Sequence, residues 1–362
     1  MRSAPWLLPA LPVLLMSCGD SLAAQSPDWQ LAIGGNFHYD WLRTDENDTL
    51  YQIGGVRRSR LSLALKAPAG FDAKLEYDVF PNTWTDAFAR WRGQGHSVRI
   101  GQFKQPMYLE ELTSDRYTMF MEQGMPGSFA LARRLGAEYS YATPQWRFGA
   151  SSYDGNLRGQ LQGTGVVTRV VYTPWADPGQ VLHLGLSLGR ERPDGDNARF
   201  SSRVEASGIG RTHLDTGTLD GVEHIRRNGV EALWIHGPWT LQGEYLRSDL
   251  SRDGAADSAL DGWYVEAGWF ANGDHTSYKD GAIDAPDIGE DGRALELAVR
   301  VSELDLDDGT VRGGDSRNFS LGANWYLSKH VRLTANYVHV DGERRDVPVA
   351  PDILEARVML TF

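Results

Sequence analysis

The sequence predicts an all-β fold, a single transmembrane β-barrel of about 16 antiparallel strands. Apolar and polar residues alternate along nearly the whole chain after its first two dozen residues, as in strands with one apolar and one polar face. These runs outnumber the strands of a common β-sandwich. Many of the 12 Trp and 14 Tyr residues lie near the ends of the runs, where membrane barrels carry aromatic girdles. A barrel with lipid outside and water inside accounts for all three observations.

The first 24 residues have the features of a secretory signal peptide. Arg2 gives a positive start, Trp6 to Met16 give an apolar core, and cleavage is expected near Ala23 or Ala24. An alternative is lipidation of Cys18, because the preceding Leu-Met-Ser resembles a bacterial lipobox. After the first cleavage the mature chain contains no cysteine. We therefore expect residues 1–24 to be removed and residues 25–362 to form one barrel domain that spans roughly Asp28 to Phe362.

The strands are expected in order along the mature chain, each bounded by Gly, Asp, Asn or Pro. In the second run, Leu61, Leu63 and Leu65 share one face. Arg60 and Lys66 lie on the other face, and the first and third runs alternate in the same way. The expected strands include 30–41, 60–66, 71–79, 98–104, 165–175, 181–189, 229–237, 239–246, 263–270, 294–302, 319–327 and 331–340.

The last run, residues 355–362, reads EARVMLTF and ends on an aromatic residue. Its regular alternation up to Phe362 resembles the signal that the outer-membrane barrel assembly machinery recognises. Pairing of this run with the first strand would close the barrel and leave no free sheet edge. Phe362 is therefore predicted to be an assembly signal.

One internal stretch lacks alternation. It follows the strand Val98 to Lys104 and continues for about thirty residues, until alternation returns at Gly136. Loops of this length in a compact domain are usually functional. We expect an inward-folded constriction loop near Gln105 to Leu135.

Several motifs, in order along the mature chain, resemble the phosphate-selective porins of Gram-negative outer membranes. The resemblance implies a 16-stranded outer-membrane barrel, a homotrimer, and passive diffusion with a preference for anions such as phosphate or polyphosphate. The sequence departs from the family pattern at Glu122-Gln123, where members often carry an acidic-basic pair, and at 271–274. The matching segments are 57–61, 75–79, 100–106, 109–116, 120–123, 133–136, 237–246, 262–281 and 321–341.

An anion channel needs positive charge that faces its lumen, and arginine can donate two hydrogen bonds to a phosphate. Strand alternation selects six lumen-facing candidates, and two more lie where the long loop ends. Lys104 and Arg116 are weaker candidates beside that loop. The alternative is that these cations only pair with nearby carboxylates, such as those of Asp86 and Asp115. The candidates are Arg58, Arg60, Lys74, Arg90, Arg92, Arg99, Arg133 and Arg134.

The net charge of −12 is unfavourable for the passage of anions, but the acidic residues are unevenly distributed along the chain. Residues 51–170 contain 15 Lys and Arg against 10 Asp and Glu. The acidic excess lies elsewhere, in runs that read as exposed loops and that could bind divalent cations bridging lipopolysaccharide. The spacing of Asp305, Asp307 and Asp308 fits a dedicated Ca²⁺ loop poorly. No metal site, cofactor or nucleic-acid partner is predicted.

The sequence thus predicts a channel for small anions and no enzymatic activity, because no metal cluster, phosphate loop or serine elbow is present. Two alternatives stay open. One is a secreted soluble β-sandwich that binds carbohydrate. The other is an outer-membrane barrel hydrolase, for which His38, His183, His236 and His339 are candidates without an obvious nucleophile partner.

Overall fold

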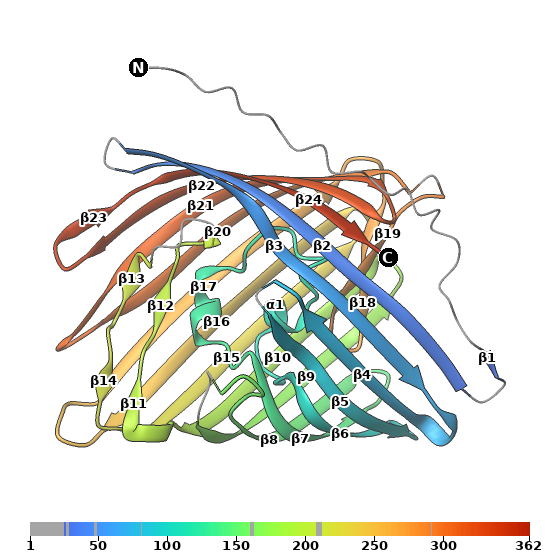
Figure 1. Cartoon of the computed structure of the whole chain (residues 1–362), viewed down its shortest axis with the longest axis horizontal. Coiled ribbons are helices and arrows are strands. Elements are labelled where there is room, and N and C mark those ends of the chain that lie inside the picture. The colour runs from blue at the N-terminus through green and yellow to red at the C-terminus, as the bar shows by residue number, and fades with distance from the viewer. Residues whose placement is uncertain are drawn as a thin grey trace.

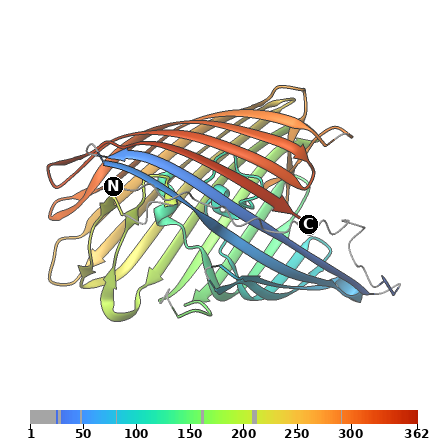
Figure 2. The same ribbon diagram turned by 45° about the horizontal axis from the view of Figure 1, so that its top comes forward.

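The computed structural model describes residues 25–26, 29–46, 49–80, 82–159, 163–207, 212–290 and 292–362. Within these residues, 16 long strands form a closed antiparallel barrel (Figures 1 and 2). The predicted signal peptide and Cys18 lie outside the described residues. No helix of the described part is long and apolar enough to cross a membrane. The barrel itself confirms the predicted fold class and excludes the soluble sandwich.

Each barrel strand pairs with its neighbours in chain order, and the last strand, β24, pairs with the first, β2, from Asn36↔Thr361 to Asp45↔Asp352. The strands are β2 (Trp29–Glu46), β3 (Thr49–Lys66), β4 (Phe71–Asp78), β5 (Thr83–Gly93), β6 (His96–Lys104), β7 (Arg133–Ala142), β8 (Trp146–Asp154), β9 (Thr164–Asp177), β10 (Gln180–Arg192), β15 (Val222–His236), β16 (Trp239–Arg252), β17 (Ser258–Phe270), β20 (Ala294–Asp308), β21 (Val311–Ser328), β22 (Val331–Arg344) and β24 (Asp352–Thr361).

Several shorter strands and helical segments accompany the sixteen barrel strands. β1 (Gln25–Ser26) pairs with β2, and β23 (Val347–Val349) pairs with β22. Three small two-stranded sheets lie outside the main sheet, and four short helical segments lie in the connections between strands. These small sheets pair β11 (Asn197–Ala198) with β14 (Leu219–Asp220), β12 (Ser201–Ser202) with β13 (Leu214–Asp215), and β18 (His275–Lys279) with β19 (Ala282–Asp287). The helical segments are α1 (Leu109–Leu112), η1 (Pro68–Gly70), η2 (Met125–Phe129) and η3 (Asp194–Asp196).

The two faces of the wall differ as alternation predicts. On the outer face, Leu61 is 54% exposed and Ile100 is 62% exposed. On the inner face, polar side chains such as Ser320 and Asn324 are fully buried. The apolar outer belt can contact the acyl chains of the membrane. The polar residues line the interior.

The two mouths of the barrel carry different connections. The mouth where β2 begins and β24 ends has mostly short turns, such as the two-residue connection between β9 and β10. The opposite mouth carries the long connections 105–132 and 193–221. Membrane barrels have short turns on the periplasmic side and long loops outside the cell. We therefore assign the terminal mouth to the periplasm, and residues 271–293 are its one long connection among the described residues.

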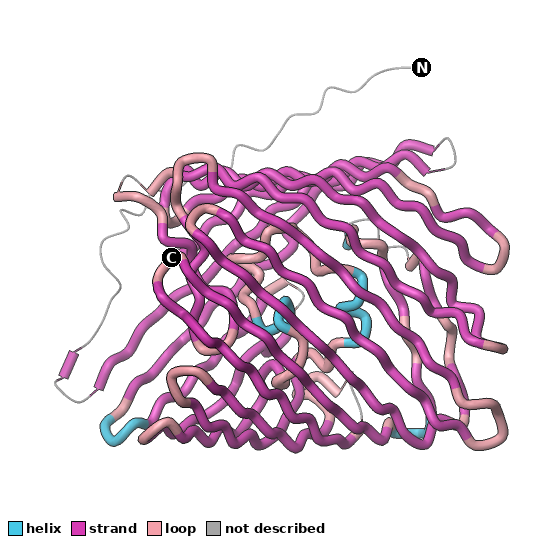
Figure 3. Tube along the Cα trace, turned by 180° about the vertical axis from the view of Figure 1, so that it is seen from behind, coloured by secondary structure: helices cyan, strands magenta, loops and turns pink. Residues whose placement is uncertain are grey.

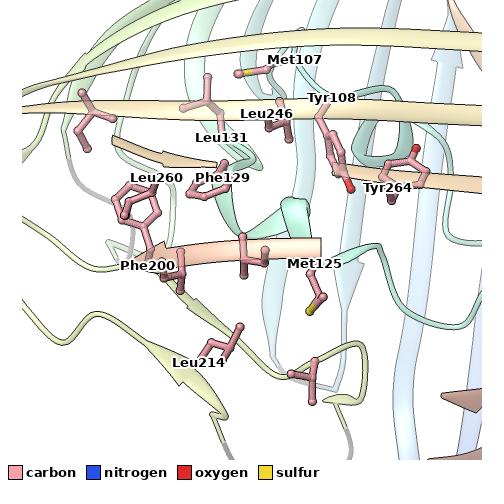
Figure 4. Packing of buried hydrophobic residues seen from close by; sticks show 14 of the residues in the cluster. Met107, Tyr108, Met125, Phe129, Leu131, Phe200, Leu214, Leu246, Leu260 and Tyr264 are labelled. Atoms are coloured by element: carbon pink, nitrogen blue, oxygen red, sulfur yellow. The ribbon is translucent and has the colours of Figure 1, made fainter. Parts of the chain in front are cut away.

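The segment 105–132 folds into the barrel, where its short helices lie inside the ring of strands (Figure 3). Met107, Tyr108 and Phe129 are buried against the inner wall, in a cluster with Leu246 and Tyr264 (Figure 4). We call this segment the inner loop. Its end differs from the expected one, because residues 133–135 belong to β7 and pair with Lys104, Phe103 and Gln102. Arg133 and Arg134 are adjacent basic residues, and each is paired with a carboxylate. The start of β7 therefore shows no apolar–polar alternation in the sequence.

Candidate ion pathway

The inner loop is fixed to one side of the barrel, the wall formed by β16 to β24. Glu244 of β16 accepts hydrogen bonds from the backbone N–H groups of Leu109 and Glu110, at 2.6 and 2.8 Å. Four wall side chains donate to backbone carbonyls of the loop. They are Arg300 to Glu122 at 3.1 Å, Asn324 to Met119 at 2.8 Å, Arg332 to Arg116 at 3.0 Å, and Arg357 to Met121 at 2.9 Å.

Buried ion pairs reinforce this attachment. The Arg300 guanidinium lies 2.8 Å from Glu205 and 3.4 Å from Glu110. Arg357 lies 2.7 Å from Asp40 and 3.4 Å from Glu122. Both arginines are almost fully buried. The cations of this wall are therefore occupied in holding the loop, and little of their charge faces open space.

The open space lies on the other side of the loop, along β3 to β7. Three neighbouring hollows follow one another there. The upper hollow lies toward the long-loop mouth, and its lining includes Arg57, Arg58 and Arg203. The lower hollow lies toward the periplasmic mouth, and its lining includes Arg90, Arg92 and Arg147. The middle hollow shares Arg60, Asp115, Lys104 and Arg133 with the upper one, and Lys74, Arg99, Leu112 and Ser114 with the lower one.

The hollows differ in charge balance. The upper hollow is nearly balanced, because it contains the loop carboxylates of Glu110, Glu111, Asp115 and Glu122. The middle hollow has six basic and three acidic side chains. Its basic members are Arg60, Lys74, Arg99, Lys104, Arg116 and Arg133, and its acidic members are Glu76, Asp86 and Asp115. The lower hollow is also mainly basic. A row of water-accessible spaces with excess positive charge therefore runs along one wall.

Seven of the eight residues singled out in the sequence line these hollows, and each has a carboxylate partner. The pairs are Arg58 with Asp115 at 2.5 Å, Arg60 with Asp115 at 2.8 Å and Asp78 at 3.0 Å, Lys74 with Asp86 at 2.7 Å, Arg90 and Arg92 with Asp72 at 2.9 and 3.0 Å, Arg133 with Asp86 at 2.7 Å, and Arg99 with Glu138. Pairing reduces the free positive charge, but cations outnumber carboxylates in the middle and lower hollows.

Arg134 occupies a different environment. Its side chain is only 5% exposed and lies 3.2 Å from Glu191, which also pairs with Arg227 at 2.7 Å. It also donates to the carbonyl of Leu131 at the end of the inner loop. Arg134 lines none of the three hollows. Its visible contacts hold the loop end against the wall.

Arg57 is a lumen residue that alternation did not select. His38 pairs with Arg58 and Tyr39 with Val56, so a β-bulge leaves Arg57 unpaired in the register between β2 and β3. The bulge turns two consecutive arginines inward, and Arg57 reaches Glu122 at 3.2 Å. The sequence did indicate this bulge. Strict alternation would place either Arg57 or Arg58 in lipid, which is energetically unfavourable.

The hairpin β18–β19 also enters the barrel, from the periplasmic mouth. The Tyr278 hydroxyl lies 2.8 Å from His183, and Arg169 donates to the carbonyl of Gly281 at 2.8 Å. Ile283 packs in one buried cluster with Leu109 of the inner loop. The sequence predicted a strand only over 263–270 and no inward hairpin after it. This hairpin was therefore missed, together with the basic side chains Arg147, Arg169 and Lys279 that line the lower hollow near it.

Two loop carboxylates keep their negative charge at neutral pH. Burial raises the pKa of Asp115, but the Arg58 and Arg60 guanidinium groups hold that pKa well below its usual range. Burial likewise opposes ionisation of Glu122, and Arg57 and Arg357 lower the pKa of Glu122 to about 2. These carboxylates therefore neutralise part of the positive charge of the upper hollow.

The closed barrel, its apolar belt and its lined interior define a porin of the outer membrane. The chain belongs to the family described as phosphate-selective porin O and P, which it matches over residues 31–362. Among curated relatives, Porin O of Pseudomonas aeruginosa is 24% identical over 376 residues, which cover 88% of this chain and 85% of that protein. An uncharacterised protein of Caulobacter vibrioides is 28% identical over 309 residues, which cover 79% of this chain and 62% of that protein.

Solved structures share the fold at low sequence identity. OmpT of Vibrio cholerae, an outer-membrane protein, matches with a TM-score of 0.63 at 11% identity over 94% of this chain and all of that one. The anion-selective porin from Comamonas acidovorans matches with a TM-score of 0.60 at 13% identity, over 92% of this chain and all of that one. Family membership and fold therefore agree on an outer-membrane porin.

Proposed function

We propose that the chain is a passive channel for small anions, phosphate or polyphosphate among them. The observation that carries the proposal is the excess of basic side chains in the middle and lower hollows. A low-dielectric wall focuses the field of such charges onto a passing ion. Its relative Porin O belongs to the same family, whose description names phosphate, and the proposal extends that chemistry to this chain. Transport of this kind includes no chemical step.

The expected preference is modest, because each candidate cation already has a carboxylate partner. Two unit charges 4 Å apart interact by about 4 kcal/mol at an effective dielectric constant of 20. A neighbouring carboxylate cancels most of that attraction. Gln123 also stands where family members often carry a cation. We infer several weak sites in series, at Arg60, Lys74, Arg99 and Arg133, which favour anions several-fold without trapping one.

The inner loop is proposed to act as the constriction of this path. It is held on the wall of β16 to β24 by Glu244 and by four side-chain donors of that same wall. Ions would then pass between the loop and β3–β7. Arg134 is assigned to holding the loop and not to ion passage, because of its burial against Glu191.

A homotrimer is proposed for the assembled protein. The support comes from a structural relative, OmpT of Vibrio cholerae, which was also solved in a trimer form and matches with a TM-score of 0.59. Light scattering in mild detergent would test it, and a mass of one protomer would contradict it.

The channel proposal is tested by reversal potentials in planar bilayers under a KCl gradient, repeated with added phosphate. The wild type should be anion-selective, and a Lys74→Gln/Arg99→Gln variant should lose most of that preference. Arg317→Gln is the matched control, because Arg317 is an exposed, ion-paired arginine of the outer wall. Cation selectivity of the wild type, or an unchanged reversal potential in the double variant, would refute the pathway.

A further inference from the structure

The outer wall carries a group of arginines at the edge of the apolar belt nearest the long-loop mouth. On β10, the outward side chains of Leu184, Leu186 and Leu188 are 45–49% exposed. The next two outward positions toward that mouth are Arg190 and Arg192, which are also exposed. The belt therefore changes from aliphatic to cationic within two residues of Leu188.

The neighbouring strand contributes a third arginine at the same height. Arg226 of β15 is exposed and lies directly opposite Arg190 in the register of β10 and β15. Below it, Val230 continues the apolar belt and is 50% exposed. We call Arg190, Arg192 and Arg226 the outer arginine patch.

Two arginines directly opposite each other on adjacent strands repel and destabilise the sheet. Within the described residues, no carboxylate pairs with any arginine of the patch. Asp249, which faces Arg226 across the strand pair, is held instead by Arg247 at 2.8 Å and by Asn228 at 3.3 Å. Asp154, near Arg190 and Arg192, accepts a hydrogen bond from the backbone of Gly155 at 2.7 Å. Neither carboxylate forms an ion pair with the patch, so the repulsion is compensated only in part by the protein itself.

A shallow groove runs beside the patch on the outer face. Leu135, Ser152, Val166 and His224 line it with Arg190 and Arg192. Its floor contains Gly136 and Gly165, so no bulky side chain fills it there. The groove therefore offers an open, partly apolar surface for a hydrocarbon chain, directly below a cluster of guanidinium groups.

We propose that the outer arginine patch and its groove bind a phosphorylated glycolipid of the outer leaflet of the outer membrane. The patch lies at the long-loop end of the apolar belt, which is the level of the outer-leaflet headgroups. Arginine donates bidentate hydrogen bonds to phosphate, and basic clusters at this height bind anionic headgroups. The headgroup phosphate neutralises the Arg190–Arg226 repulsion, and one acyl chain lies in the groove over Val166.

The test titrates the purified protein in detergent with bisphosphorylated lipid A and measures binding by native mass spectrometry. EDTA is included, so that divalent cations cannot bridge the lipid to surface carboxylates. The Arg190→Gln/Arg226→Gln variant should bind about tenfold more weakly or worse. Arg317→Gln is the matched control, because Arg317 also lies on the outer face, but it is paired with Glu303 and belongs to β21, away from the patch. It should bind lipid A as the wild type does.

Three further measurements make the outcome decisive. Lipid A without its phosphates should bind the wild type as weakly as lipid A binds the double variant. Millimolar inorganic phosphate should not displace the lipid. In lipid-free detergent the double variant should be at least as heat-stable as the wild type, and lipid A should raise the melting temperature of the wild type alone. Each single variant should show an intermediate loss.

Equal binding of lipid A by wild type and double variant would overturn the proposal, as would equal binding of the dephosphorylated lipid. Displacement by inorganic phosphate would indicate a free-anion site, and a change of oligomeric mass in the double variant would indicate a contact between copies of the chain. Either result would also overturn it. Channel selectivity should be unchanged in the double variant, because the patch lies outside the lumen, so this test is independent of the proposed ion pathway.

Discussion

At the scale of single residues, the pathway is built from ion pairs and not from free cations. Arg99 illustrates this, because it donates to Glu138 through Nε at 2.8 Å and its guanidinium lies 4.0 Å from the centroid of the Phe103 ring. The pair fixes the position of the cation, and Phe103 covers one of its faces. An ion that passes must compete with Glu138 for the exposed edge of Arg99.

This pairing leads to a graded prediction for selectivity. Arg99→Gln leaves the Glu138 carboxylate without its cation, so the reversal potential should move clearly toward cation preference. Arg99→Gln/Glu138→Gln removes both charges and keeps the net charge of the hollow, so the shift should be smaller. Both are measured in planar bilayers under a KCl gradient. If the two variants show equal shifts, the local charge balance does not set selectivity at this position.

Alternation located most lumen residues but not all of them. It placed Lys74, Arg90 and Arg99 on the inner face, and the three side chains line the lower hollow. It missed Arg57, because the bulge in β3 shifts the phase by one residue and only the pairing with β2 reveals it. The carboxylate partner of Arg58, Asp115, lies on the inner loop, whose path no periodicity encodes. Other partners, such as Glu138 for Arg99, depend on which strands become neighbours in the barrel.

At the scale of elements, the inner loop depends on a few polar anchors. Glu244 accepts two backbone N–H groups at the first residues of α1. A buried backbone N–H group that loses its acceptor costs about 1–3 kcal/mol. Glu244→Ala should therefore loosen the loop, with faster proteolytic cleavage within 105–132 and greater open-channel noise. Glu244→Gln keeps one acceptor oxygen and should lie between the wild type and the alanine variant. Wild-type noise and cleavage in both variants would contradict this role.

The ion pairs of the loop set its response to acid. Arg57 and Arg357 lower the pKa of Glu122 from 4.5 to about 2 despite its burial. A carboxyl with a depressed pKa contributes stability above its unfolded pKa and loses that contribution as pH falls through its folded pKa. The shift corresponds to roughly 3 kcal/mol. The contribution of Glu122 should thus be complete at pH 5 and above, and should disappear between about pH 4.5 and pH 2.

Melting temperatures in detergent across that range check this expectation. The wild type should lose stability steeply below about pH 4.5, and Glu122→Gln should show a shallower decline because it lacks this titration. Glu122 stays ionised from pH 5 to pH 8, so its titration should not change the conductance in that range. Identical acid slopes for the two proteins would show that Glu122 does not couple loop attachment to pH.

At the scale of the whole molecule, the sequence predicted the architecture better than it predicted the interior. The strand number, the closure and the apolar outer belt follow from apolar–polar alternation. This alternation is visible within the sequence of each strand and does not depend on distant residues. The hairpin β18–β19 was not recognised, because its strands, His275–Lys279 and Ala282–Asp287, are short and show no regular apolar–polar alternation. The wall–hairpin bond between Thr240 and Thr276, at 2.7 Å, joins residues that only the closed barrel brings together.

Phe362 lies at the seam where β24 pairs with β2 and closes the barrel. The backbone of Phe362 exchanges hydrogen bonds with Gly35, at 3.1 and 2.9 Å. A Cβ atom on Gly35 would lie 2.6 Å from the Phe362 ring and 2.5 Å from the carbonyl of Arg60. The glycine therefore leaves room for the terminal ring at the seam, and Phe362 completes the pairing of β24 with β2.

Because Phe362 lies at this seam and not in the lumen, its replacement should affect assembly more than transport. Phe362→Ser should lower the yield of heat-resistant protein in the outer membrane, while the channels that do assemble keep wild-type conductance and reversal potential. Phe319→Ser is the matched control, since Phe319 is 42% exposed on the outer wall but lies within β21. A yield loss in both variants alike would point to lost lipid contact and not to a terminal signal. Wild-type yield of Phe362→Ser would show that the assembly machinery recognises this chain by another feature.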